Sequence, residues 1–259
     1  MLLSYAQTLY MLPVSLFGMS VSAAELPAMS SALGTDSEIA ATLRSRLGAG
    51  LQKISFFVVP SAVAFLALGN VVASTLYRTG KFSEQDVLFV WAALAGSGVG
   101  LLAQTMGRLY SSTFYALRDT RTPLRYALVR VALTLCLGYL FALPLPRALG
   151  IDHNWGVAGL TASAGIAGWV EFVLLRRGLQ ARIGHVEFST ARVLKLWAAA
   201  LASAALAVLL ERSLHLASPV LRGLAVLIPY GVAYLVITHL LGVSSALSSI
   251  FARMGMKRS

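Results

Sequence analysis

The chain alternates between long apolar runs and short polar stretches. A run of about 17 to 25 apolar residues can cross a bilayer as a helix, and a helix satisfies every backbone polar group without water. We therefore predict an all-α fold, a polytopic transmembrane helical bundle that forms a single lobe. Its seven expected spans are residues 2–29, 51–68, 87–107, 124–143, 156–175, 196–212 and 221–242.

Polar and helix-breaking residues indicate how several of these helices begin or bend. Pro13 and Gly18 lie inside the first run, so we expect a kinked helix there. Ser83 precedes an acidic first turn, which is typical of a capped helix N-terminus. Asp36 or Ser37 is placed in the same way to cap an amphipathic helix that leads into the second span.

Composition narrows the class of protein further. Apolar residues make up 58% of the chain, charged residues make up 12%, and the mean hydropathy is +0.76. Such a chain cannot cover a soluble domain with charge, so we predict an integral membrane protein. Cys136 is the single cysteine, which excludes an intrachain disulfide.

The net charge of +11 is distributed in short clusters between the apolar runs. That distribution is typical of the positive-inside bias of membrane proteins and argues against a nucleic-acid partner. All but five of the 21 Lys and Arg residues fall in the loops 30–53, 108–130 and 176–195 or in the tail 244–259. We therefore predict that these segments, including the basic tail, are cytoplasmic. Seven spans then put the N-terminus outside and the C-terminus inside. The five exceptions are Arg78, Lys81, Arg147, Arg212 and Arg222.

The segment between the third and fourth spans carries the most specific motif, Phe114-Tyr115-Ala116-Leu117-Arg118-Asp119-Thr120-Arg121-Thr122-Pro123. This decapeptide closely resembles a signature between two transmembrane helices of the MurJ (MviN) family of lipid II flippases, in the MOP transporter superfamily. The resemblance extends over essentially the whole chain. It implies the C-terminal lobe, about the last seven of fourteen helices, of a bacterial inner-membrane flippase. It further implies alternating access, with lipid II as substrate, and with membrane lipids and the missing N-terminal lobe as partners.

The resemblance also suggests substrate-binding residues on the first span. Gln7 and Thr8 occupy positions where many family members carry an Asp-Arg pair that faces the central cavity. Uncharged side chains can still hydrogen-bond a pyrophosphate or a sugar, but without charge assistance. Glu25 is expected either to pair with Arg44 or Arg46 or to line the cytoplasmic mouth of the cavity.

Arg118, Asp119 and Arg121 have two competing interpretations. In the first, Asp119 caps the following turn while the arginines fix the topology. In the second, the arginines form a basic gate that meets the pyrophosphate of the lipid, because guanidinium groups bind phosphate through two hydrogen bonds. Glu171, near the cytoplasmic end of the fifth span, is expected to be satisfied by Arg176, Arg177 or water.

Nothing in the sequence points to catalysis. Motifs for zinc proteases, nucleotide-binding loops and nucleophile elbows are absent, so we predict no catalytic residues, no metal and no cofactor. The sodium site proposed for some relatives is not expected, because the matching part of the fourth span reads Cys136-Leu137-Gly138-Tyr139. Three alternatives stay open: an exporter of another polyprenyl-linked oligosaccharide, a non-transporting scaffold, and an inactive truncated product.

Overall fold

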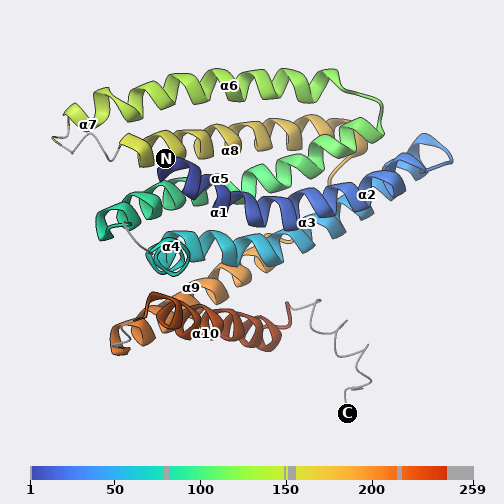
Figure 1. Ribbon diagram of the computed structural model, residues 1–259. Helices are drawn as coiled ribbons and strands as arrows, with labels where there is room; N and C mark the ends of the chain where they lie inside the picture. The colour runs from blue at the N-terminus through green and yellow to red at the C-terminus, as the bar shows by residue number, and fades with distance from the viewer. Residues whose placement is uncertain (1, 79–81, 149, 151–155, 215–217, 244–259) are drawn as a thin grey trace, which may run out of the picture.

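The computed structural model describes residues 2–78, 82–148, 150, 156–214 and 218–243, and every regular element in these ranges is helical. The tail 244–259 lies outside the described residues. Figure 1 shows the helices in order along the chain. They are α1 (Leu2–Pro13), the π-helix η1 (Val14–Met19), α2 (Ser20–Ser30), α3 (Asp36–Ala67), α4 (Gly69–Tyr77), α5 (Glu84–Ala116), α6 (Arg121–Ala142), α7 (Pro144–Ala148), α8 (Gly156–Ile183), α9 (Thr190–Ser213) and α10 (Pro219–Leu240).

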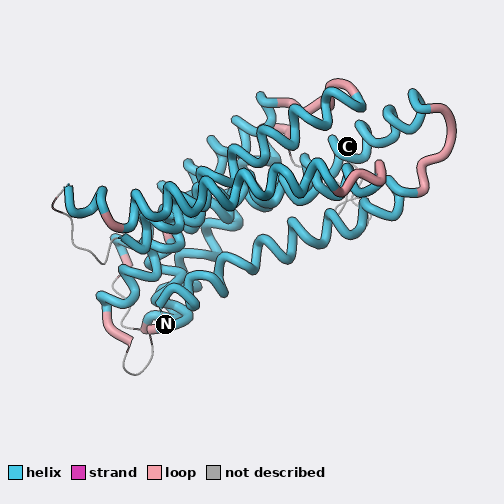
Figure 2. Tube along the Cα trace, turned by 90° about the horizontal axis from the view of Figure 1, so that it is seen from above, coloured by secondary structure: helices cyan, strands magenta, loops and turns pink. Residues whose placement is uncertain are grey.

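Seven helical spans in the described ranges are long and apolar enough to cross a membrane, which confirms the predicted fold class. The first span consists of α1, η1 and α2 in succession, and Figure 2 shows the long helices running side by side along a common direction. Several helices are longer than the apolar runs. At 1.5 Å per residue, the 32 residues of α3 measure about 48 Å, whereas the hydrocarbon core is about 30 Å thick. These helices therefore continue beyond the apolar layer.

Side-chain caps set the starts of the two longest helices. Ser83 caps α5 as expected, in a reciprocal pair of hydrogen bonds with Asp86. Thr35, rather than Asp36 or Ser37, caps α3. Its hydroxyl accepts a hydrogen bond from the Glu38 N–H, and the Glu38 carboxylate accepts one from the Thr35 N–H. A capping pair of this kind satisfies two otherwise unpaired N–H groups. The helix therefore begins at the cap rather than where the apolar run begins.

Helix α5 lies at the centre of the bundle and packs against α8 on one side and α3 on the other. Small residues bring α5 and α8 into backbone contact. A Cβ atom added at Gly100 would lie 2.3 Å from the Cα atom of Gly165, and one added at Gly96 would lie 2.6 Å from the carbonyl oxygen of Ala158. Close approach through glycine is a common way for membrane helices to associate, because it maximises van der Waals contact.

Two tyrosines attach α10 to a defect in α3. Pro60 has no N–H group, so the carbonyl of Phe56, four residues earlier, lacks its usual helical donor. The Tyr234 hydroxyl donates a hydrogen bond of 2.6 Å to this Phe56 oxygen, and the Tyr230 hydroxyl donates one of 2.7 Å to the Pro60 oxygen. The last helix is thus fixed to the bundle at a point set by one proline.

Replacing Tyr234 with phenylalanine is expected to destabilise the protein by about 1 kcal/mol, because the Phe56 carbonyl would lose its donor in an apolar environment. A fall of the thermal midpoint in detergent by about 2–4 °C would show this. Tyr139→Phe is the matched control, since Tyr139 is exposed on α6. Equal midpoints for the two variants would contradict the role given to Tyr234.

Candidate functional site: a polar cavity between four helical spans

A polar cavity of about 370 Å³ lies where η1 and α2 meet α5, α6 and α8. Its wall is unusual for a bundle of apolar helices because it carries three charged groups together with hydroxyl and amide groups. The lining residues are Met19, Ser22, Gln104, Gly107, Arg108, Ser111, Ser112, Tyr115, Arg130 and Glu171. A polar cavity between membrane helices is where a transported polar group can leave water without losing all its hydrogen-bonding partners.

Helical periodicity explains why α5 supplies most of this wall. Gln104, Arg108, Ser111 and Tyr115 follow one another at intervals of four, three and four residues, so they form one stripe along α5. The opposite side of α5 is buried against other helices. Arg108 lies two turns before the end of α5 at Ala116, inside the helical span rather than in the following loop.

Arg108 is the unpaired charge of the cavity. Its side chain is exposed, and among the described residues no hydrogen bond or ion pair is recorded for it. One turn away, the Tyr10 hydroxyl of α1 donates a 2.7 Å hydrogen bond to Gln104 Oε1 and ties the first helix to the same stripe. The guanidinium of Arg108 is therefore available to an anion that enters the cavity.

Arg130 and Glu171 form an ion pair on the cavity wall. Arg130 Nη1 of α6 lies 3.1 Å from Glu171 Oε2 of α8. The partner of Glu171 is therefore Arg130, and the expectation of Arg176 or Arg177 is wrong. Arg130 lies 41 residues away in sequence, and only the antiparallel alignment of α6 and α8 brings the two groups together.

Gln7 and Thr8 lie on α1 with exposed side chains, and neither lines the described cavity. The Thr8 hydroxyl donates a hydrogen bond of 2.9 Å to the carbonyl of Ser4 in its own helix. Their proposed contact with substrate stays a prediction. The adjoining π-helix, η1, is short, and such segments are frequent at functional sites.

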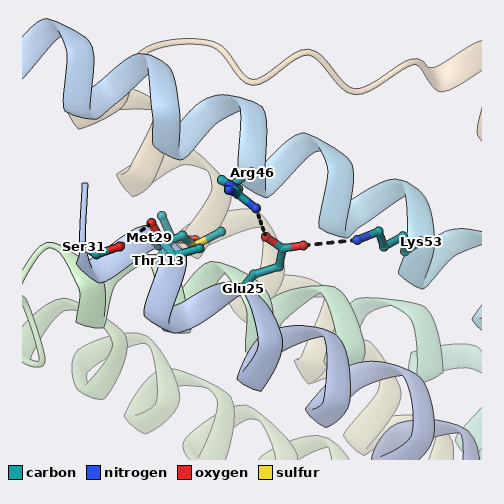
Figure 3. Close-up of polar contacts among 7 residues, drawn as sticks. Glu25, Met29, Ser31, Arg46, Lys53 and Thr113 are labelled. Carbon is teal, nitrogen blue, oxygen red and sulfur yellow. Dashed lines mark hydrogen bonds and ion pairs between the residues drawn. The ribbon is translucent and has the colours of Figure 1, made fainter. Parts of the chain in front are cut away.

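Glu25 on α2 is buried between two basic residues of α3 (Figure 3). Its Oε1 atom lies 3.2 Å from Lys53 Nζ, and its Oε2 atom lies 3.6 Å from Arg46 Nη1. Arg44, the other expected partner, instead donates a hydrogen bond to the carbonyl of Ile183. The ion pairs therefore join α2 to α3, and Glu25 is not among the residues that line the cavity.

The decapeptide forms a tight corner between α5 and α6. Arg118 has a positive φ of 58°, and the Asp119 N–H donates to the Phe114 carbonyl, which closes the end of α5. The carboxylate of Asp119 accepts hydrogen bonds from the N–H groups of Arg121 and Thr122 and from the Thr122 hydroxyl. These bonds from Thr122 hold the pKa of Asp119 below its ordinary value. Asp119 thus caps the start of α6.

Arg182 of α8 completes this corner and was not found from the sequence. Its Nη2 atom lies 2.6 Å from Asp119 Oδ2, and its guanidinium carbon lies 5.5 Å from the centre of the Phe114 ring. Arg118 and Arg121 are both exposed at the corner. This geometry supports the capping interpretation of Asp119 and leaves the arginines free to contact the membrane surface or an anion.

Chemically, the cavity can bind an anion. Two guanidinium groups and several hydroxyl groups offer donors, whereas Glu171 supplies the only carboxylate among the lining residues. Within the described part of the chain, no group of three or more His, Cys, Asp or Glu side chains could hold a metal ion.

Seven apolar spans, four of which line a polar cavity that contains arginine, define a polytopic helical membrane protein. The model of the family described as "Lipid II flippase MurJ" matches residues 1–228, and the chain belongs to this family. It is a multi-pass protein of the inner membrane. The resemblance inferred from the decapeptide is thereby confirmed.

Individual relatives agree with this assignment. A lipid II flippase MurJ of Burkholderia cenocepacia is 32% identical over 181 residues, which cover 70% of this chain and 33% of the relative. A probable lipid II flippase MurJ of Rhizobium meliloti is 30% identical over 174 residues, which cover 67% of this chain and 30% of the relative. The chain thus spans about a third of the length of these curated relatives.

A solved structure shows the same fold. The structure titled "Lipid II flippase MurJ, inward closed conformation" matches with a TM-score of 0.70 at 22% identity. The match covers 93% of this chain and 47% of the solved chain. Nearly all of the helical arrangement described above therefore corresponds to about half of a known flippase fold.

Proposed function

We propose that this chain is the C-terminal lobe of a lipid II flippase and that it moves the undecaprenyl-pyrophosphate-linked precursor across the inner membrane together with an N-terminal lobe. The observation that carries the proposal is the arginine-bearing cavity inside a bundle of the flippase fold. Two lobes that rock about such a cavity would expose the headgroup to each face of the membrane in turn, while the lipid tail stays in the bilayer.

Arg108 is the residue that we assign to the pyrophosphate, because it is a cavity guanidinium without a recorded partner in the described ranges. A charge-assisted hydrogen bond is roughly twice as strong as a neutral one, and a guanidinium can form two in parallel. Gln7 and Thr8 remain candidates for neutral hydrogen bonds to the pyrophosphate or the sugar of the headgroup. In this proposal Glu25, Arg118, Asp119 and Arg121 act at the cytoplasmic end of the lobe.

The proposal is tested by rescue of cells depleted of their flippase. The 259-residue chain alone is expected to fail, because it corresponds to only 47% of the solved flippase chain. Co-expression with a matching first half is expected to restore growth and the flipping of lipid-linked precursor. Failure of the co-expressed halves, with both inserted at normal levels, would favour a scaffold or an inactive product. Rescue by the single chain would contradict the half-transporter proposal.

We further propose that the α5–α6 corner is cytoplasmic, with the N-terminus outside, on the basis of the charge distribution. A cysteine at exposed Thr120, in a Cys136→Ala background, is expected to react with an impermeant maleimide only from the cytoplasmic side. Gln85→Cys, at the other end of α5, is the matched control and is expected to react only from outside. Labelling of Thr120→Cys from outside in intact cells would contradict the proposed topology and indicate the opposite orientation.

A further inference from the structure

The ion pair between Arg130 and Glu171 is not needed to hold α6 and α8 together. Helices α6 and α8 already approach closely through small residues: a Cβ atom added at Gly159 would lie 2.6 Å from the Phe141 carbonyl oxygen. Ionised groups inside a membrane bundle are costly and usually serve a polar pathway. The pair therefore calls for an explanation in terms of the cavity that both residues line.

The two partners differ in how far they are exposed. The Arg130 side chain is 36% exposed, whereas the Glu171 side chain is 14% exposed. The carboxylate thus lies deeper in the wall, and the guanidinium lies nearer to the open space. For Glu171, Arg130 is the one recorded side-chain partner among the described residues. Glu171 holds Arg130 at the edge of the cavity, where part of the guanidinium fork is still accessible.

Arg108 and Arg130 contribute the two positive charges of the cavity, one from α5 and one from α6. A diphosphate presents two phosphoryl groups, and each can accept the paired hydrogen bonds of one guanidinium. A guanidinium has five N–H donors, so Arg130 can turn donors toward an anion after it leaves the carboxylate. Two guanidinium groups around one cavity therefore favour a diphosphate over a single phosphate.

We propose that Glu171 is a positioning residue that holds Arg130 as the second half of a diphosphate site. When a diphosphate enters the cavity, the ion pair between Arg130 and Glu171 breaks and Arg130 pairs with the diphosphate instead. This inference rests on the proposed function and deepens it. In the empty cavity Glu171 neutralises Arg130 and lowers the affinity for the anion. In the occupied cavity the diphosphate bridges Arg108 of α5 and Arg130 of α6, and it replaces the α6–α8 ion pair.

The exchange predicts a specific pattern of binding constants for inorganic pyrophosphate, measured with the full 259-residue chain in nanodiscs of zwitterionic lipid. Glu171→Gln is expected to tighten binding about tenfold, because Arg130 no longer has a competing carboxylate. Arg130→Gln is expected to weaken binding about tenfold. The double variant is expected to match Arg130→Gln, since Glu171 acts only through Arg130. Glu171→Asp, which keeps the charge, should fall between wild type and Glu171→Gln.

Helix content and thermal midpoint of each variant show whether it is folded. Tightening by Glu171→Gln that persists in the Arg130→Gln background would overturn the inference, because Glu171 would then repel the anion directly. The inference would also be overturned if folded Glu171→Gln and Glu171→Asp bound pyrophosphate no more tightly than wild type. Absence of pyrophosphate binding in every form would overturn it too. The proposed flippase function is tested separately, by the rescue with co-expressed halves, so failure of the binding experiment does not decide it.

Discussion

Replacing Gly100 with alanine is expected to cost at least about 1–3 kcal/mol and to reduce the amount of folded protein sharply. The added Cβ atom would lie 2.3 Å from the Cα atom of Gly165, and no flexible side chain can move aside there. Helices α5 and α8 must separate to admit it. Because the cavity is lined by both helices, its shape would change too.

Gly231→Ala is the matched control for this variant. Gly231 lies within α10, and a Cβ atom there would meet no heavy atom within 4 Å. Alanine is favoured over glycine in a helix by about 0.5–1 kcal/mol, so the control is expected to be neutral or slightly stabilised. The measurement is the thermal midpoint and the monodisperse yield in detergent. Equal values for the two variants would show that the α5–α8 backbone contact does not stabilise the bundle.

Arg108→Gln is expected to reduce flipping of the lipid-linked precursor by at least about tenfold when the variant chain is co-expressed with a first half. The change removes charge-assisted bonds that contribute about 1.5–3 kcal/mol, and 1.4 kcal/mol corresponds to a factor of ten. Glutamine keeps the polarity and approximate length of the side chain. The loss would therefore report on the guanidinium rather than on the shape of the cavity.

Arg177→Gln provides the control for Arg108→Gln. Arg177 is exposed on α8, lies in one of the segments assigned to the cytoplasmic face, and does not line the cavity. Its replacement removes the same charge from the same face, so any effect through topology would appear in both variants. Normal flipping by Arg108→Gln at normal abundance would exclude Arg108 from substrate binding. Equal losses in both variants would show that net charge, rather than the cavity, is responsible.

The helical spans could be predicted because apolar run length alone determines which segments can cross a bilayer. Their ends were less predictable. The charge pattern predicts one loop over residues 108–130, whereas α5 continues to Ala116 and α6 begins at Arg121. The caps at Thr35 and Ser83 extend helices past the apolar runs, so hydropathy underestimates helix length.

The cavity was missed for the same reason. The charge pattern alone makes Arg108 a topology signal in a loop, although its spacing from Gln104 and Ser111 fits one face of a helix. Continuing the helical periodicity through Tyr115 would have indicated the stripe. The partners of Glu171 and Asp119 could not be predicted in this way, because Arg130 and Arg182 reach them only through the packing of α6 and α8. The sequence contains no local signal for such contacts.

The most direct test of the account is whether lipid II enters the cavity. Ser112 lines it, so Ser112→Cys in a Cys136→Ala background can be alkylated with a small maleimide, using co-expressed halves in nanodiscs. Ser45→Cys is the control, since Ser45 lines a different cavity between α3 and the α8–α9 loop. At ten times its Kd, lipid II is expected to slow alkylation at position 112 by about tenfold and to leave position 45 unchanged. Alkylation of Ser112→Cys at the same rate with and without bound lipid II would contradict the assignment of the cavity to the headgroup.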